Sequence, residues 1–122
     1  MKFGDYFKNH FETHDNSEYS ELCSRYYRAR IEDAISAIKE LVVKNNDKMV
    51  DENEYYNEYL FQSPKYSCTA KITVITPVEV GIDFNIYTYS ILGMGKGIKY
   101  IKEFYDYLDS KLSFKGTSLY RG

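Results

Sequence analysis

The sequence is poor in the residues that staple small folds together. Its 122 residues include two cysteines, two prolines and no tryptophan. A chain of this length can bury a core without a disulfide or a metal. Cys23 and Cys68 are therefore expected to be reduced, buried thiols. No segment approaches the ~20 consecutive apolar residues of a membrane-spanning helix, so no membrane association is expected.

The chain also lacks an excess of charge of either sign. It has 16 Lys and Arg against 18 Asp and Glu, a formal net charge of −2. This balance excludes the basic field of a generic DNA-coating protein, and equally a heavily acidic DNA mimic. The segment Met1–Tyr6 has no apolar signal-peptide core, so a cytoplasmic location is expected. Residues with AT-rich codons outnumber those with GC-rich codons, which indicates a low-GC genome, or a phage or mobile element within one.

Apolar residues in the N-terminal half recur every three or four positions, which is typical of amphipathic helices. Phe3, Phe7 and Phe11 predict a short helix over about 5–14. After a break at 15–17, a long helix is predicted over 17–45. Its apolar positions are Tyr19, Cys23, Tyr26, Tyr27, Ile31, Ala34, Ile35, Ile38, Leu41 and Val42.

The middle of the chain changes to a period of two, which is typical of strands. Residues 66–75 and 78–90 alternate on either side of Thr76-Pro77 and predict an antiparallel hairpin. Segment 55–62 is predicted to be a third strand, with a helical turn as the alternative. A final helix is predicted over 98–112. The residues expected to face the helices from the hairpin are Cys68, Ile72, Val80, Ile82 and Phe84.

Together these elements predict one α+β domain over residues 1–122. We expect a two-layer sandwich with an antiparallel sheet of about three strands within 55–90. One face of that sheet is apolar and the other polar. The long N-terminal helix and the C-terminal helix are therefore expected to cover the same, apolar face.

A candidate anion site combines a buried arginine with a glycine-rich loop. Arg30 falls about 20° from Tyr19 and Cys23 on a helical wheel at about 100° per residue, and a buried guanidinium needs a partner. It pairs with a structural carboxylate, extends past the sheet edge, or binds an anion. The loop Gly93–Gly97 is either an ordinary turn or a cradle for phosphate at a helix start. The candidate ligands are Arg30, Gly95, Lys96, Gly97 and Lys99.

The order of elements over 65–112 resembles that of double-stranded-RNA-binding domains. The resemblance is carried by Pro64, Tyr66, Phe84, Gly93-x-Gly95 and Lys99. The paired lysines and the alanine-rich face of that family's last helix are missing here, as is its central Gly-Pro-x-His. The resemblance implies RNA as one ligand of the anion site.

Tyrosine is the residue in greatest excess, with 14 among 122 positions. Tyrosines either fill the edges of a core that has no tryptophan, or form a docking surface. On the last predicted helix, Tyr100, Phe104 and Tyr107 lie about 100° from the stripe that begins at Ile98. The two stripes together form an apolar arc that is wider than one sheet can cover. We therefore expect an interface at Tyr100, Phe104, Tyr107, Tyr87 and Tyr89, with a homodimer packed through the last helix.

No arrangement of residues predicts catalysis or a cofactor. His10 and His14 lack the further ligands that zinc needs, and nothing predicts a shifted pKa for Glu79 or Asp83. The sequence therefore predicts a non-enzymatic protein that docks on another protein, as an inhibitor, immunity protein or anti-defence or accessory factor. The alternative is a binder of a phosphorylated ligand, nucleotide or RNA, through Arg30 and Gly93–Gly97.

Overall fold

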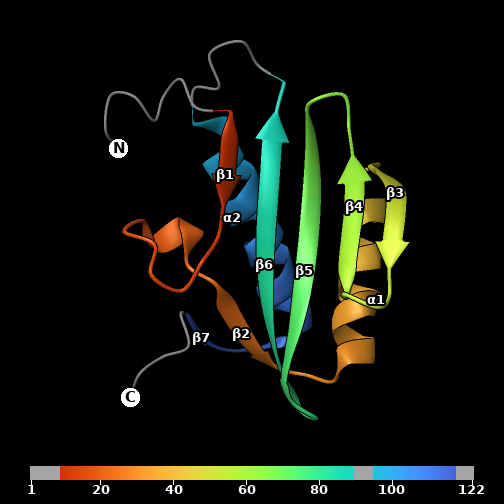
Figure 1. Cartoon of the computed structure of the whole chain (residues 1–122), viewed down its shortest axis with the longest axis vertical. Helices are drawn as coiled ribbons and strands as arrows, with labels where there is room; N and C mark the ends of the chain where they lie inside the picture. The colour runs from red at the N-terminus through yellow and green to blue at the C-terminus, as the bar shows by residue number, and fades with distance from the viewer. Residues whose placement is uncertain (1–8, 90–94, 118–122) are drawn as a thin grey trace.

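The computed structural model describes residues 9–89 and 95–117, and these form an antiparallel sheet with two helices on one face (Figure 1). The helices are α1 (Ile31–Lys44) and α2 (Lys96–Lys111), and a 3-10 turn, η2 (Ser20–Leu22), precedes the second strand. The strands are β1 (His10–Glu12), β2 (Arg25–Arg28), β3 (Lys48–Asn53), β4 (Glu58–Gln62), β5 (Tyr66–Thr76), β6 (Glu79–Thr88) and β7 (Ser113–Thr117).

Six of the seven strands follow the order β3-β4-β5-β6-β2-β7. The seventh, β1, also pairs with β6, on the same side as β2. β2 pairs with the first half of β6, where Arg25 lies opposite Ile82. β1 pairs with its second half, where Glu12 lies opposite Asn85. One side of β6 is therefore shared by two short strands, and the chain between them leaves the sheet.

The predicted hairpin is confirmed. β5 and β6 pair antiparallel from Tyr66 opposite Thr88 to Thr76 opposite Glu79, with a register shift between Val74 and Thr76. The side chains expected to face the helices are buried, with exposed fractions of 1% or less for Cys68, Ile72, Val80, Ile82 and Phe84.

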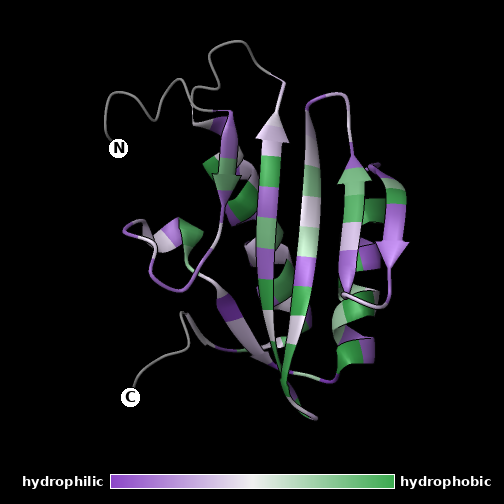
Figure 2. Ribbon diagram, viewed as in Figure 1, coloured by the Kyte–Doolittle hydropathy of each residue, from purple (hydrophilic) through white to green (hydrophobic). Residues whose placement is uncertain are grey.

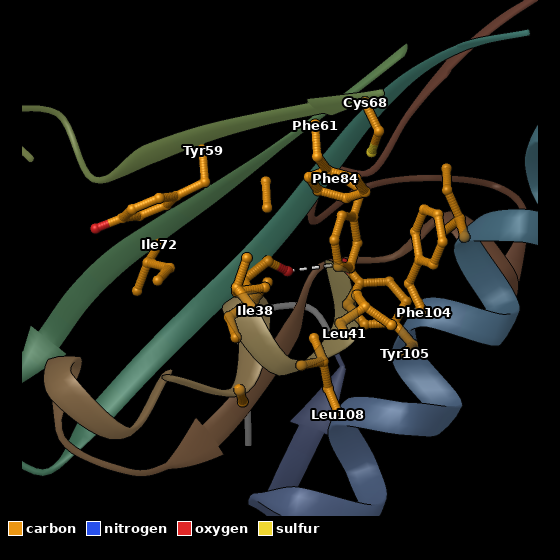
Figure 3. Close-up of a cluster of buried hydrophobic side chains, with 14 of the residues drawn as sticks. Ile38, Leu41, Tyr59, Phe61, Cys68, Ile72, Phe84, Phe104, Tyr105 and Leu108 are labelled. Carbon is orange, nitrogen blue, oxygen red and sulfur yellow. Dashed lines mark hydrogen bonds between the residues drawn. The ribbon is translucent and has the colours of Figure 1, made fainter. Parts of the chain in front are cut away.

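The core lies between the sheet and the two helices. Figure 3 shows aromatic rings from both layers meeting there. The ring centroid of Phe104 on α2 lies 5.7 Å from that of Phe61 and 5.3 Å from that of Phe84. From α1, Ile38 and Leu41 are buried in the same cluster. Hydrophobic and hydrophilic bands alternate along β5 and β6, as the two-faced sheet requires (Figure 2).

The α+β class is right, but the predicted arrangement is wrong. The sheet has seven strands instead of about three, and no helix spans 17–45. That segment contains η2, β2 and the shorter helix α1. The described end of the predicted helix over 5–14 is β1, and residues 1–8 lie outside the described residues. The polar stretch before Tyr55 is β3, and 55–62 contains β4. The predicted helix over 98–112 corresponds to α2.

The prediction of a long helix is wrong because side chains on both faces of β2 are buried, which gives this strand no alternation of apolar and polar residues. Tyr27 lies opposite Val80 and points into the core, whereas Tyr26 lies opposite Gly81 on the other face. The exposed fractions of Tyr26 and Tyr27 are 5% and 0%. A Cβ at position 81 would lie 2.6 Å from Tyr26 Cε1, so glycine makes room for the ring. Two adjacent buried tyrosines are compatible with the apolar stripe of a helix and also with a strand that is buried on both faces. The sequence pattern alone therefore does not distinguish the two.

Within the described ranges, neither helix is long and apolar enough to cross a membrane.

Candidate functional site

The face of the sheet opposite the helices carries an exposed aromatic stack. The rings of His10 and Tyr87 lie nearly parallel, with centroids 4.2 Å apart and an interplanar angle of 11°. His10 Nε2 lies 2.6 Å from Asn85 Oδ1, which orients the imidazole. Tyr87 is 51% exposed. The pairing of β1 with β6 thus presents an oriented aromatic surface to solvent.

Residues 13–24, between β1 and β2, form a loop that returns to the place where it left the sheet. The backbone N–H of His14 donates to Leu22 O at 3.0 Å, and that of Ser24 donates to His14 O at 3.2 Å. Between Asn9 and Ser24 the chain has four Asp or Glu residues and no Lys or Arg. We therefore call residues 13–24 the acidic loop.

Asp83 on β6 holds the two ends of the acidic loop together. Its Oδ1 accepts a hydrogen bond from Thr13 Oγ1 at 2.6 Å and a second from the Ser24 hydroxyl. Thr13 Oγ1 also accepts from the backbone N–H of Phe84 at 3.0 Å. The carboxylate is thus engaged by the protein's own hydroxyls, and it fixes the loop to the sheet.

Burial raises the pKa of Asp83, and the hydrogen bonds from Ser24 and Thr13 offset part of this rise because they favour the charged form. We predicted no shift here, because the residues that surround Asp83 come from a distant part of the chain. Residues 13 and 24 are far from 83 in sequence and meet it only through the strand order.

Beside the stack, the acidic loop and β1 enclose a hollow of about 470 Å³. Its lining includes the carboxylates Glu12 and Glu18 and the imidazoles His10 and His14. The remaining lining residues are Phe11, Asn16, Ser17, Tyr19 and Leu22. Among residues 9–89 and 95–117, no three His, Cys, Asp or Glu side chains are grouped to hold a metal ion.

The predicted stripe on the last helix is not an exposed surface. Phe104 is 1% exposed and packs in the core. Tyr100 is half-buried with its ring centroid 4.9 Å from that of Tyr66. Tyr107 is half-buried between two lysines, with Lys44 Nζ 5.4 Å and Lys111 Nζ 5.5 Å from its ring centroid. The helix buries a wider arc than one sheet requires because it packs against α1 and η2 as well as against the sheet. Of the predicted interface, Tyr87 and Tyr89 are exposed, at 51% and 53%.

The structure does not bring the predicted anion ligands together. Arg30 is exposed at the N-cap of α1 and does not point into the core. The neighbouring Ala29 N–H donates to Val78 O, at the start of β6, whereas Gly95 follows the end of that strand. The ten residues of β6 extend about 33 Å at ~3.3 Å per residue. Gly97 lies close to Ile86 near the end of β6, so Arg30 and Gly97 lie toward opposite ends of the sheet.

The glycines at the start of α2 have structural roles. Gly95 is the N-cap and has a φ of 70°, which favours glycine. Gly97 is buried, and a Cβ there would lie 2.5 Å from Phe11 Cδ2. Gly93 lies outside the described residues. Lys96 and Lys99 are exposed.

Of the predicted anion ligands, Lys96 lines a cavity. A cavity of about 370 Å³ is lined by Lys65 and Lys96, together with Pro64, Thr88, Tyr89 and Tyr100. It adjoins the first turn of α2, where backbone N–H groups favour negative charge. Lys65, which the sequence did not single out, thus replaces Arg30 as the second cation.

Among the described arginines, Arg25 is the one that packs against the aromatic rings on the helix side. Arg25 Cζ lies 5.0 Å and 5.1 Å from the ring centroids of Tyr105 and Phe114. Its Nη1 lies 2.6 Å from Asp109 Oδ2, and Tyr27 Oη donates to Asp109 Oδ1 at 2.7 Å. The alternation of Arg25 and Tyr27 with Ser24, Tyr26 and Arg28 was the signal that could have revealed a strand.

These features define an antiparallel α+β protein with one sheet face covered by helices, the other open, and an acidic loop beside an exposed aromatic stack. Comparison of the chain with family models, with curated proteins and with solved structures gave no match.

Proposed function

We propose that this chain is a non-enzymatic binding protein that docks on a basic protein surface through its open sheet face. The observation that carries the proposal is the exposed His10–Tyr87 stack beside the acidic hollow. Inhibitor, immunity and accessory proteins form the functional class that fits such docking.

The stack supplies the apolar part of the contact. Aromatic side chains contribute most of the binding energy in many protein interfaces. The ring of Tyr87 is held against His10, and His10 against Asn85. A side chain ordered before binding loses less entropy on binding, so this stack is a favourable anchor.

The hollow supplies the charged part of the contact. Glu12 and Glu18 line it, and no Lys or Arg occurs in the surrounding chain from Asn9 to Ser24. A partner's arginine or lysine side chain that enters this hollow meets two carboxylates, and no Lys or Arg of the described residues lines it. Charge complementarity therefore favours a basic partner.

Binding of a tri-arginine peptide, followed by ¹H–¹⁵N NMR on the full chain, tests the charged contact. We expect shifts at the amides of residues 10–19, and a several-fold weaker effect in the double variant Glu12→Gln, Glu18→Gln. Glu32→Gln, Glu40→Gln is the matched control, because both glutamates are exposed on α1. Equal effects in the two double variants, or shifts spread over all acidic surfaces, would contradict the proposal.

The contribution of the His10–Tyr87 stack to binding is tested with a protein partner. Capture from a lysate of the source organism, with wild type and with Tyr87→Ser, identifies proteins that depend on the stack. Val43→Ser is the control, because Val43 is 74% exposed on α1, away from the stack. The proposal requires a basic captured protein that is lost with Tyr87→Ser and retained with Val43→Ser. An acidic partner, or loss with the control alone, would contradict it.

The second candidate function is binding of a phosphorylated ligand at the cavity lined by Lys65 and Lys96. Two lysines and two tyrosines suit a phosphate with an attached base or sugar. Titration with ATP in the same NMR experiment should then shift the amides of Gly95–Gly97 and lose this effect in Lys65→Gln, Lys96→Gln. Unchanged amide positions up to millimolar ATP would rule out this candidate.

A further inference from the structure

At one end of the sheet, the β5–β6 hairpin projects beyond β4 (Figure 1). The backbone N–H of Ile72 donates to Asn57 O at 2.9 Å, immediately before β4 begins. β5 continues to Thr76, and among the described strands only β6 accompanies it there. Residues 73–76 therefore form an edge in the middle of the sheet order.

The backbone of Val74 faces this open side. Residues of an antiparallel strand point their N–H and C=O groups alternately to the two neighbours. The N–H and C=O groups of Ile72 point toward the β4 side. Those of Val74, two residues on, therefore point the same way, whereas those of Thr73 point toward β6. Within the described residues, no donor or acceptor from the β4 side meets Val74. One N–H and one C=O are thus available to an added strand.

This edge lacks the charges that usually prevent strand addition. Charged side chains on an edge strand discourage pairing with other chains. The outer strand β3 carries Lys48, Asp51 and Glu52, and the opposite outer strand β7 carries Lys115. Residues 72–78, Ile-Thr-Val-Ile-Thr-Pro-Val, contain no charged residue. The structure thus protects its outer edges and leaves this inner one unprotected.

Exposed apolar side chains lie on both sides of the edge. The β3–β4 turn contributes Tyr55 and Tyr56, which are 85% and 59% exposed. The hairpin contributes Val74, Ile75 and Val78, at 49%, 38% and 55%. At ~200 Å² for a whole tyrosine side chain and ~100 Å² for a whole Val or Ile, these five expose roughly 400 Å². A standard interface buries about 800 Å² per partner, so this area suits a weak complex.

We propose that two copies of this chain form a dimer by antiparallel pairing of residues 73–75 of β5 around a two-fold axis at Val74. Val74 of each copy then exchanges both backbone hydrogen bonds with Val74 of the other. The tip residues Pro77 and Val78 of one copy approach the Tyr55–Tyr56 turn of the other. The interface is isologous, so each contact occurs twice.

A second copy fits this edge for two reasons. An axis at Val74 opposes identical uncharged segments, so no like charges meet. The apolar turn and the apolar tip lie on the same molecule, next to the same edge, and the two-fold axis brings each against the other. This dimer differs from the one expected from the sequence, whose central residue Phe104 is buried in the core. It is also independent of the proposed docking function, which uses the stack at the other end of β6.

Hydrogen exchange measured by NMR at two concentrations of the full chain tests the pairing directly. About 20 μM and about 1 mM bracket the dissociation constant of a weak interface. We expect the Val74 amide to exchange at least tenfold more slowly at the higher concentration. The Thr73 amide faces β6 in both states and is the internal control. Equal protection of Val74 at the two concentrations would overturn the proposal.

Sedimentation equilibrium of variants provides the second test. Val74→Pro removes the N–H on the open side without removing a bond to β6, and proline is accepted on strand edges. We expect at least tenfold weaker dimerisation, and a similar loss in Tyr55→Ser, Tyr56→Ser. Val43→Ser is the matched control, because Val43 is 74% exposed on α1 away from the edge. A wild-type monomer at 1 mM, or a dimer unchanged in both folded variants, would overturn the proposal. If Val74→Pro does not fold, the tyrosine variant and hydrogen exchange decide.

Discussion

Arg25 Nη1 lies 2.6 Å from Asp109 Oδ2, and this ion pair joins β2 to α2 on the helix side of the sheet. The two side chains are 20% and 27% exposed, and the guanidinium lies between the rings of Tyr105 and Phe114. Phe114 belongs to β7, the last strand described. The pair thus connects the start of β2 with the C-terminal part of the fold.

Asp109→Asn should lower the free energy of unfolding by about 1–3 kcal/mol, because Arg25 keeps its burial and loses its counter-charge. Asp106→Asn is the control. Asp106 Oδ2 also lies 2.9 Å from Lys102 Nζ, but both side chains are more than half exposed, and such pairs contribute about 0.5 kcal/mol or less. Urea denaturation measures both. Equal losses in the two variants would mean that burial does not strengthen the Arg25 pair.

Gly81→Ala should destabilise the protein by about 1–3 kcal/mol, because the added methyl group displaces the ring of Tyr26. The displacement also disturbs the hydrogen bond from Tyr26 Oη to Asp15 Oδ1, which is 2.8 Å long. Adding Tyr26→Leu should make the double variant more stable than the sum of the single effects predicts. Thermal denaturation of the four proteins checks this, and strict additivity would contradict the close approach.

Asp83→Asn should change how stability depends on pH. Burial raises the pKa of Asp83 in the folded state above its value in the unfolded chain. The folded protein then binds more protons than the unfolded chain between these two pKa values. This contribution to stability is therefore present below the unfolded pKa and is lost as pH rises through the folded pKa. We expect the wild type to lose stability relative to Asp83→Asn over that interval. Parallel pH profiles in urea denaturation would exclude the raised pKa.

Phe104→Ala should lower the free energy of unfolding by about 3–5 kcal/mol, as expected for a fully buried aromatic side chain. Tyr107→Ser should cost less than half as much, because Tyr107 is only partly buried. Chemical denaturation measures both losses. Two small, equal losses would contradict the burial of Phe104 and would favour the exposed stripe that the sequence predicted.

The sequence predicted best the parts of the fold whose pattern is contained within one segment. β5 and β6 alternate along ten or more residues each and meet at Thr76-Pro77, so the hairpin and its buried face follow from local spacing. α2 follows from the spacing of Ile101, Tyr105 and Leu108. The long helix predicted over 17–45 is wrong, and only its second part is helical, as α1. Nothing local separates the apolar stripe of α1 from the tyrosines before it.

The parts that could not be predicted depend on partners from distant segments. Tyr26 is buried on the open face because Gly81 of β6 leaves space beneath its ring. Arg25 faces inward because Asp109 lies beneath it. The candidate site is of the same kind: Tyr87 was identified from the sequence, but its stack with His10 arises only when β1 pairs with β6.

Because β1 and β2 pair with the same side of β6, the acidic loop between them begins and ends close together. Glu12 and Arg25 are 25 − 12 = 13 positions apart in the chain, whereas their partners Asn85 and Ile82 are 85 − 82 = 3 apart on β6. The surplus of ten residues is closed off by Asp83 and by the backbone bonds of His14. We therefore expect that changes in length or charge between these closing contacts leave the pairing of β1 and β2 with β6 in place. Under the proposed docking function, such changes would alter the binding partner and leave the fold in place.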